Sequence, residues 1–263
     1  MTIPAPSPYR ITAVRVLHSE WHKFRSLRST WVTLLSASAL VLGTGVTMGA
    51  TYTPGGGDAD IDTVVLVLVL YGTLLGQLCI TVLGILVTAG EYSTGLIRAS
   101  LIAVPGRVPV LWAKAAVFTA AAFTSLFATA LLTFLAAQLL LRGTDQKAGL
   151  TDPGILGAIA GNSAGITLLG LIALGLGALL RSVPGSIGAF IGGVLVLPEV
   201  LGMLPYDAVE SALAYFPTQA AGALGSATPF PGAAAAGPAL LALCLWAAVS
   251  LGAAAVLLRR RDA

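Results

Sequence analysis

The sequence predicts an all-α integral membrane protein with six transmembrane helices and with both termini in the cytoplasm. Hydrophobic residues make up 57% of the chain and charged residues only 10%, which excludes a soluble globule of ordinary surface composition. Apolar runs of the length that crosses a bilayer, about 20 residues for roughly 30 Å of hydrocarbon, recur six times. These runs are continuously apolar, without the alternation of a membrane barrel, so the spanning elements are expected to be helices.

The predicted transmembrane domain covers residues 31–258 and lies between two cytoplasmic segments, residues 1–30 and the basic tail 259–263. The predicted spans are residues 31–50, 63–88, 115–141, 155–180, 187–204 and 238–258. The first cytoplasmic loop is then 89–114, and a long outer segment covers 205–237.

The orientation follows from Lys and Arg, which concentrate in cytoplasmic loops. With the N-terminus inside, only Arg142 and Lys147 fall outside, and all other Lys and Arg residues fall in predicted cytoplasmic segments. We therefore expect a multi-pass protein of the cell's inner (cytoplasmic) membrane, in contact with the lipid bilayer. The net charge of +3 fits loops that face anionic lipid, and we predict no nucleic-acid partner.

The N-terminal segment carries the pattern of an amphipathic helix that lies in the inner membrane interface. Its apolar residues recur at steps of three and four, and they are Ile11, Val14, Leu17, Trp21 and Phe24. Trp21 suits the headgroup level, where an indole keeps its ring in apolar surroundings and its N–H in water. Lys23 and Arg25 join it as the candidate interfacial residues. The segment lacks the apolar core of a cleavable signal.

Glycines and prolines mark two further regions of the membrane domain. Glycine is dense in the fourth and fifth spans, where small residues let helices approach closely. Close packing within the chain is the favoured explanation, and a subunit interface is the alternative. Four prolines interrupt the outer segment 205–237, so we expect one or two short helices that lie at the outer leaflet or dip into it.

No residues form a recognisable catalytic centre, and we predict no catalytic residue and no metal or cofactor bound by this chain. The sequence has no phosphate-binding loop of the Gly-x-x-x-x-Gly-Lys-Ser/Thr type. The two histidines, His18 and His22, have helical spacing but no third ligand nearby. The span centres carry no charge, which argues against an ion relay. Gln77, Asn162 and Glu199 are the polar residues that could line a substrate path, although Glu199 is better explained by contact with headgroups.

The first cytoplasmic loop holds the most informative stretch. From Gly90 it runs Glu-Tyr-Ser-Thr-Gly-Leu-Ile-Arg-Ala-Ser-Leu to residue 101 and continues to Arg107. We expect a short helix here, capped by Ser93 or Thr94 and ended by Pro105-Gly106. The candidate functional residues are Glu91, Tyr92, Ser93, Thr94, Gly95, Arg98, Leu101 and Arg107. Glu91 is expected either to pair with a basic group, such as Arg98 or one on a partner, or to fix its own turn.

These residues resemble a known family. The order Glu-Tyr-Ser-Thr-Gly-x-Ile-Arg-x-x-Leu after a second span, with Ser-Glu-Trp-His-Lys-Phe-Arg-Ser at 19–26 before the first, is similar to the membrane permease subunits of type-2 ABC exporters. The resemblance implies two permease subunits in each transporter, a coupling helix in the first cytoplasmic loop, and re-entrant helices between the last two spans.

The function implied by the resemblance is that of an exporter permease driven by a separate ABC ATPase subunit, with ATP and Mg on that partner. The second permease copy would make a homodimer, or a heterodimer if it is a different chain. Two alternatives come from other classes: an ion-gradient-driven carrier that acts alone, and a non-transporting membrane immunity or scaffold protein. Apolar spans with few polar groups would tolerate a lipid-like or amphiphilic substrate.

Overall fold

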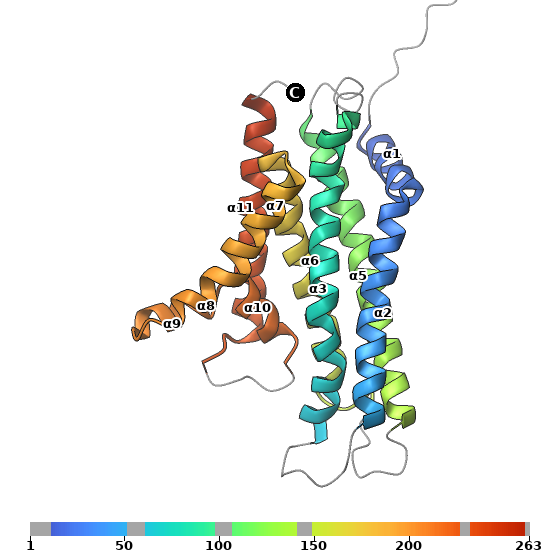
Figure 1. The fold of residues 1–263 in the computed structure, drawn as a ribbon, viewed down its shortest axis with the longest axis vertical. Coiled ribbons are helices and arrows are strands. Elements are labelled where there is room, and N and C mark those ends of the chain that lie inside the picture. The colour runs from blue at the N-terminus through green and yellow to red at the C-terminus, as the bar shows by residue number, and fades with distance from the viewer. Residues whose placement is uncertain (1–11, 52–60, 98–106, 141–148, 227–231, 261–263) are drawn as a thin grey trace, which may run out of the picture.

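The computed structural model describes residues 12–51, 61–97, 107–140, 149–226 and 232–260, which form helices and turns and no strand (Figure 1). Within these residues, six helical stretches are long and apolar enough to cross a membrane. They are Arg28–Thr47, Gly72–Thr94, Val108–Leu140, Ile155–Leu180, Val183–Leu201 and Ala236–Arg260. The chain is therefore a multi-pass, all-helical membrane protein, as the sequence predicts.

Three helices extend beyond the predicted spans: α2 (Arg28–Thr51), α3 (Ile61–Thr94) and α5 (Val108–Leu140). Helix α1 (Ala13–Ser26) precedes the first span, and α6 (Ile155–Leu180) coincides with the predicted span 155–180. Hydropathy locates only the part of a helix that lies in hydrocarbon, whereas helices of 34 and 33 residues, α3 and α5, are about 50 Å long at 1.5 Å per residue. As a result, the first residues of the loop motif belong to the last turn of α3, and Lys114 belongs to α5. Both positions lie outside the predicted spans.

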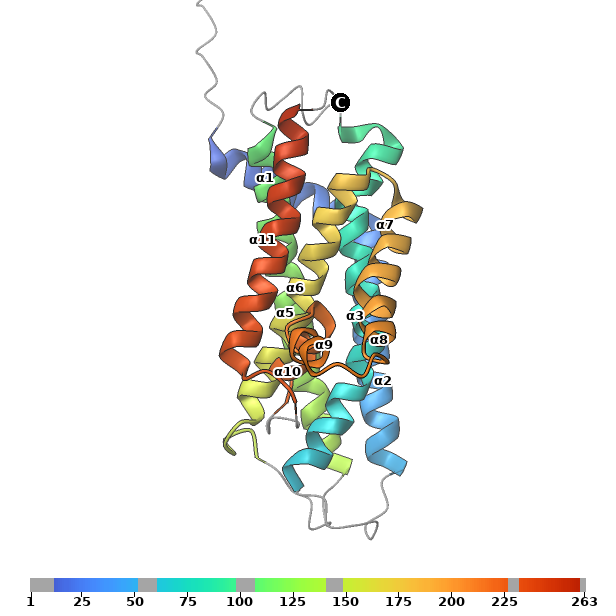
Figure 2. The ribbon, with the colours of Figure 1, turned by 90° about the vertical axis from the view of Figure 1, so that its left-hand side faces the viewer.

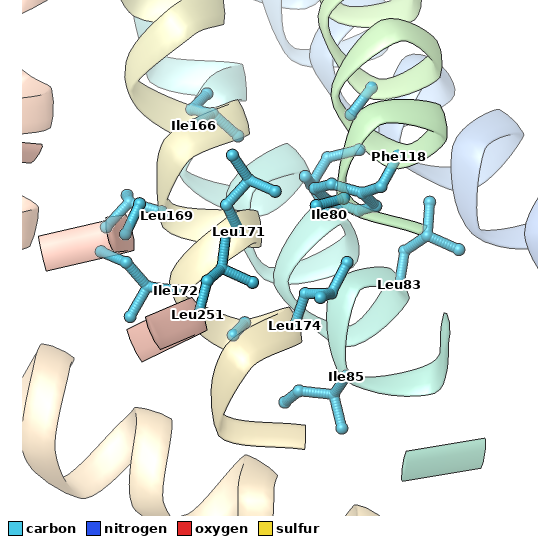
Figure 3. Packing of buried hydrophobic residues seen from close by; sticks show 14 of the residues in the cluster. Ile80, Leu83, Ile85, Phe118, Ile166, Leu169, Leu171, Ile172, Leu174 and Leu251 are labelled. Carbon is cyan, nitrogen blue, oxygen red and sulfur yellow. The ribbon is translucent and has the colours of Figure 1, made fainter. Parts of the chain in front are cut away.

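Helix α6 is the centre of the bundle, and 72% of an 18-residue apolar stretch within it is buried (Figure 2). It packs against α3, α5, α10 and α11, and Figure 3 shows Ile166, Leu171 and Leu174 of α6 beside Ile80 of α3 and Phe118 of α5. Two hydroxyls reach its carbonyls from neighbouring helices: Thr88 donates to Leu174 O at 2.9 Å, and Ser250 donates to Ile172 O at 2.9 Å.

Small residues make this close approach of helices possible, as predicted for the fourth span. A Cβ added to Gly84 would collide with the carbonyl oxygen of Gly170, and one added to Gly177 would collide with the hydroxyl of Thr88. By contrast, Gly188 and Gly192 of the fifth span have open space where a Cβ would stand. Close packing within the chain thus explains the glycines of α6 from Gly161 to Gly177, but not Gly188 and Gly192 of the fifth span.

The fifth span is a broken helix that leans away from the bundle (Figure 1). It consists of α7 (Val183–Phe190), a π-helical turn η1 (Ile191–Val196) and α8 (Leu197–Leu201), instead of the single run 187–204. In η1 the N–H of Leu197 bonds to the carbonyl of Gly192, five residues back. The next residue, Pro198, has no N–H and its ring needs room at the preceding turn, which the wider π turn provides. Only 22% of this span is buried.

Two short helices occupy the described part of the outer segment, in agreement with the prediction of one or two. They are α9 (Asp207–Leu213) and α10 (Pro217–Leu224), and they precede α11 (Ala236–Arg260). Pro217 begins α10 at a position where a missing N–H costs nothing. Helix α10 packs on α6 and α11, whereas α9 has no buried residue. The indole N–H of Trp246 on α11 donates to Tyr215 O at 3.2 Å and holds the turn between α9 and α10.

Candidate functional site: a buried charge cluster between three helices

Four charged side chains from three helices meet at the end of the bundle that carries α1. The ammonium group of Lys114 lies 2.7 Å from Glu20 Oε2 and 2.5 Å from Glu91 Oε1. Lys23 completes the group, at 2.7 Å from Glu20 Oε1 and 3.5 Å from Glu91 Oε1. We call these four residues the charge cluster. It joins α1, the last turn of α3 and the beginning of α5.

The charge cluster is buried, although it lies at one end of the bundle. Glu20, Glu91 and Lys114 expose only 4%, 7% and 4% of their surface, and Lys23 is the outward-facing member. Two carboxylates and two ammonium groups cancel in charge, so each buried ion has a partner of opposite sign. Removing one member would leave an uncompensated buried charge, which costs about 3–5 kcal/mol.

Local sequence explains how each side chain is aimed at the cluster. Glu20 and Lys23 lie three residues apart on α1 and thus on one face of it, together with Val16 and Phe24, which are also buried. Thr12 caps the helix by accepting a hydrogen bond from the N–H of Arg15. The predicted apolar stripe is therefore divided, since Phe24 points into the bundle while Val14, Leu17 and Trp21 are exposed.

Glu91 is unfavourably placed within its own helix. It lies in the last turn of α3, where the helix dipole disfavours an acid. The ion pair with Lys114 supplies the stabilisation that the helix end does not. Glu91 thus joins helices and does not merely fix its own turn, which was the alternative interpretation of this residue. Its second oxygen, Oε2, accepts no hydrogen bond from the described residues. Arg98, the partner proposed within the loop, lies outside the described residues.

Tyr92 connects the same end of α3 to the C-terminal end of α6. The guanidinium carbon of Arg181 lies 5.0 Å from the centre of the Tyr92 ring, within the range of a cation–π contact. Arg181 is the C-cap of α6 and has a left-handed backbone, φ 54°. Because neighbouring residues on a helix point about 100° apart, Glu91 and Tyr92 contact different partners. Together they connect the end of α3 to α1, α5 and α6.

The expected capping by Ser93 or Thr94 is not what the structure has. Both residues belong to the last turn of α3, and both hydroxyls donate to the carbonyl of Gly90 at 2.9 Å. These are the i−3 and i−4 back-bonds of hydroxyl residues within a helix, and they do not begin a new one. The chain leaves α3 at Gly95, whose φ of 75° suits glycine. Leu101 and Pro105-Gly106 lie outside the described residues, and Arg107 precedes α5 with φ 53°.

The remaining candidates do not join the charge cluster, except for Lys23. Trp21 and Arg25 are exposed on α1, and the interfacial position of this helix stays a prediction. Gln77 on α3 and Asn162 on α6 are partly buried, whereas Glu199 on α8 is exposed. No described hydrogen bond joins these last three residues, so the structure does not bring them together as one path. Where the chain is described, no group of His, Cys, Asp and Glu has a metal-binding arrangement.

Sequence reasoning missed the roles of Glu20, Lys114 and Arg181. Glu20 and Lys114 are 94 positions apart, so no local pattern connects them. One signal was present: the predicted cytoplasmic segments contain only three acids, Glu20, Glu91 and Asp262, among many bases. Rare acids in a basic region, each beside a membrane span, are candidates for ion pairs between helices. Neither the comparison with protein-family models nor that with curated proteins found a match for this chain.

Proposed function

We propose that this chain is the membrane permease subunit of an ATP-driven type-2 ABC exporter. In this proposal the first cytoplasmic loop receives motion from a separate ATPase subunit, and the spans pass it to a substrate path between two permease copies. The chain itself carries no catalytic residue, and ATP and Mg bind to the partner. The end with the charge cluster then faces the cytoplasm, and α1 lies in the inner interface of the inner membrane.

The observation that carries the proposal is the meeting of the two stretches on which the resemblance rests. Ser19–Ser26 and the motif that begins at Glu91 are separated by a whole pair of spans, yet Lys114 binds a carboxylate from each. A push on the loop after α3 would act directly on Glu91 and Tyr92. Through Lys114 and Arg181 that push would reach α1, α5 and α6.

These ion pairs are suited to passing motion from the loop to the helices, because they are short and allow little independent movement of the helix ends. The cluster joins helix ends by ion pairs of 2.5–2.7 Å, and the helices behind them are packed through glycines. A displaced helix end must therefore either move its neighbours or break buried ion pairs. The interfacial α1 would move together with the loop.

The carrier alternative is less well supported. A relay of ions needs charged groups deep in the membrane, and the segments 63–90, 115–141 and 154–180 contain no charged residue. The charge cluster lies at one end of the bundle and its charges cancel. A scaffold or immunity role would not require the loop to be joined to three helices. Under that role, substitutions in the charge cluster would change stability only.

The test is co-purification followed by ATP hydrolysis. The tagged full-length chain is isolated from its native membranes, and the associated ATPase subunit is reconstituted with it in liposomes. We expect Glu91→Gln to lower ATP turnover by about tenfold or more, as expected when roughly 1.4 kcal/mol of coupling is lost, while the ATPase stays bound. Lys114→Arg keeps the charge and should retain most of the turnover.

Arg259→Gln is the matched control, since Arg259 is exposed at the same end of the molecule and belongs to no described ion pair. Isolation without any ATPase subunit would contradict the proposal. So would unchanged ATP turnover in Glu91→Gln. Uptake into liposomes that is driven by a proton or sodium gradient without ATP would establish the carrier instead.

A further inference from the structure

A cavity of about 460 Å³ opens between α9 and α10. This volume lies within the range of sites that hold small molecules, about 300–1,000 Å³. Its walls come from Glu210 and Leu213 of α9, from Gln219 and Gly222 of α10, and from Gly232 and Ala233 before α11. The cavity lies apart from the charge cluster and shares no residue with it.

The cavity wall combines apolar surface with one charge. Leu213, Ala214 and Ala223 supply the apolar part, Gln219 supplies an amide, and Glu210 is the one charged residue among the described residues of the lining. The Glu210 carboxylate lies close to the segment before α11, since its Oε1 is 3.6 Å from the position that a Cβ on Gly232 would occupy. A molecule between these walls would therefore meet a carboxylate at one side and hydrocarbon at the other.

The stretch of sequence that carries this carboxylate contains no base. Between Arg181 and Arg259 the sequence contains three acids, Glu199, Asp207 and Glu210, and no Lys, Arg or His. No described ion pair involves Glu210. A surplus of acids along one stretch of chain favours cations over anions.

Two large exposed side chains precede α9 in the chain. Met203 and Tyr206, just before α9, are 83% and 63% exposed. An exposed apolar surface beside a membrane-spanning helix suits contact with lipid, so a molecule dissolved in the leaflet would reach the cavity from the side. A small hydrated ion would gain nothing from these apolar surroundings.

We propose that the α9–α10 cavity binds cationic amphiphiles, molecules with one positive charge on an apolar body. Glu210 pairs with the charge, and the Leu213, Ala214 and Ala223 wall covers the apolar part. Binding here does not require ATP, a partner subunit or transport.

The test uses the purified full-length protein in a neutral detergent, with tetraphenylphosphonium as the probe and equilibrium dialysis as the measurement. Triphenylphosphine oxide is the neutral comparison and tetraphenylborate the anionic one. We expect the cation to bind more tightly than either. The fluorescence of Trp246 offers a second readout. The other three tryptophans lie in the first half of the sequence, whereas the N–H of Trp246 bonds to Tyr215, between α9 and α10.

Two variants separate the charge from the apolar wall. Glu210→Gln should weaken tetraphenylphosphonium by about fivefold, the size of a partly exposed ion pair, and leave the neutral compound unchanged. Its control is Asp207→Asn, a neighbouring acid that does not line the cavity. Gly222→Leu fills the cavity and should weaken the cation and the neutral compound alike. Its control is Gly252→Leu, because both glycines have open space for a side chain.

Several results would overturn the proposal. Equal binding by Glu210→Gln and wild type would remove the role of the carboxylate, and an equal loss in Asp207→Asn would indicate a diffuse acidic field instead of a site. Equal binding of all three probes would indicate partition into detergent. Displacement of the probe by micromolar Ca²⁺ would indicate a metal site. Glu210 is exposed, so its replacement should leave the melting temperature unchanged, and a large fall would also count against the assignment.

Discussion

The charge cluster and the fifth span with α9 place charged residues in opposite ways. At the cluster, two acids and one base are buried beside the outward-facing Lys23, and each has a partner of opposite sign. The fifth span is mostly unburied, and three acids lie on α8 and α9, without a single base between Arg181 and Arg259. The first arrangement fixes helices to one another, whereas the second leaves charge available to something outside the chain.

Packing follows the same division. Around α6 the helices approach so closely that a methyl group would not fit at Gly84 or Gly177, while Gly188 and Gly192 of the fifth span face open space. A rigid unit of α3, α5 and α6 thus stands beside a broken helix with few contacts. The difference indicates that changes in the first unit act on the whole bundle, and changes in the second act locally.

The largest effect is expected from Lys114→Met. It leaves the carboxylates of Glu20 and Glu91 buried without the ammonium group between them, at a cost of about 3–5 kcal/mol. We expect a marked fall in the melting temperature in detergent, or loss of folded protein on expression. The triple variant Glu20→Leu, Glu91→Leu, Lys114→Met should recover most of the stability, because it removes all three buried charges of the cluster together. No recovery would contradict this account of the cluster.

A smaller effect is expected when side chains are added at glycines of the two regions. Gly84→Val would force α3 away from the carbonyl of Gly170, and we expect it to cost about 1–3 kcal/mol, as overpacking does. Gly188→Val has the open space that Gly84 lacks and should change the melting temperature little. Equal effects at both positions would remove the distinction between the two regions.

The Tyr92–Arg181 contact should contribute less to stability than Lys114 or the close packing at Gly84. Tyr92→Leu keeps an apolar side chain at the end of α3 but removes the hydroxyl and the ring, and the cation–π contact is worth about 0.5–1 kcal/mol at a partly exposed site. Tyr92→Phe keeps the ring and serves as the control. If Tyr92→Phe is as destabilising as Tyr92→Leu, the hydroxyl and not the ring is the important part.

The smallest effect on stability is expected at the acids of the open region. Glu199→Gln changes an exposed residue without a described partner, and its free energy of unfolding should stay within about 0.5 kcal/mol of wild type. A thermal melt beside the Lys114→Met variant checks the contrast directly. A large loss in Glu199→Gln would show that this acid is structural.

Several parts of the fold followed from the sequence because they depend on local composition. Hydropathy identified all six spans, and residues 155–180 agree with α6 end to end. The prolines of 205–237 predicted the short helices α9 and α10. The boundaries of α3 and α5 were missed because helices continue beyond the hydrocarbon, where hydropathy no longer reports on them.

The candidate site was predicted only in part. Glu91 and Tyr92 stood out in the motif, and Glu20 and Lys23 lay within the second stretch of the resemblance. Their partners did not stand out, because Lys114 and Arg181 are single basic residues beside spans, where bases are common. The predicted N-cap role of Ser93 and Thr94 was wrong, since hydroxyl residues suit both the beginning of a helix and the last turn of another.

By itself, the sequence determined the helical class, the spans and the position of the loop motif, because these depend on hydrophobicity and on residues close together in the chain. The tertiary structure decided that Lys114 lies between Glu20 and Glu91, that Tyr92 lies against Arg181, and that the acids of α8 and α9 have no described basic partner. Such pairings depend on how helices from distant parts of the chain pack side by side, and a sequence pattern with a period of a few residues does not contain that information.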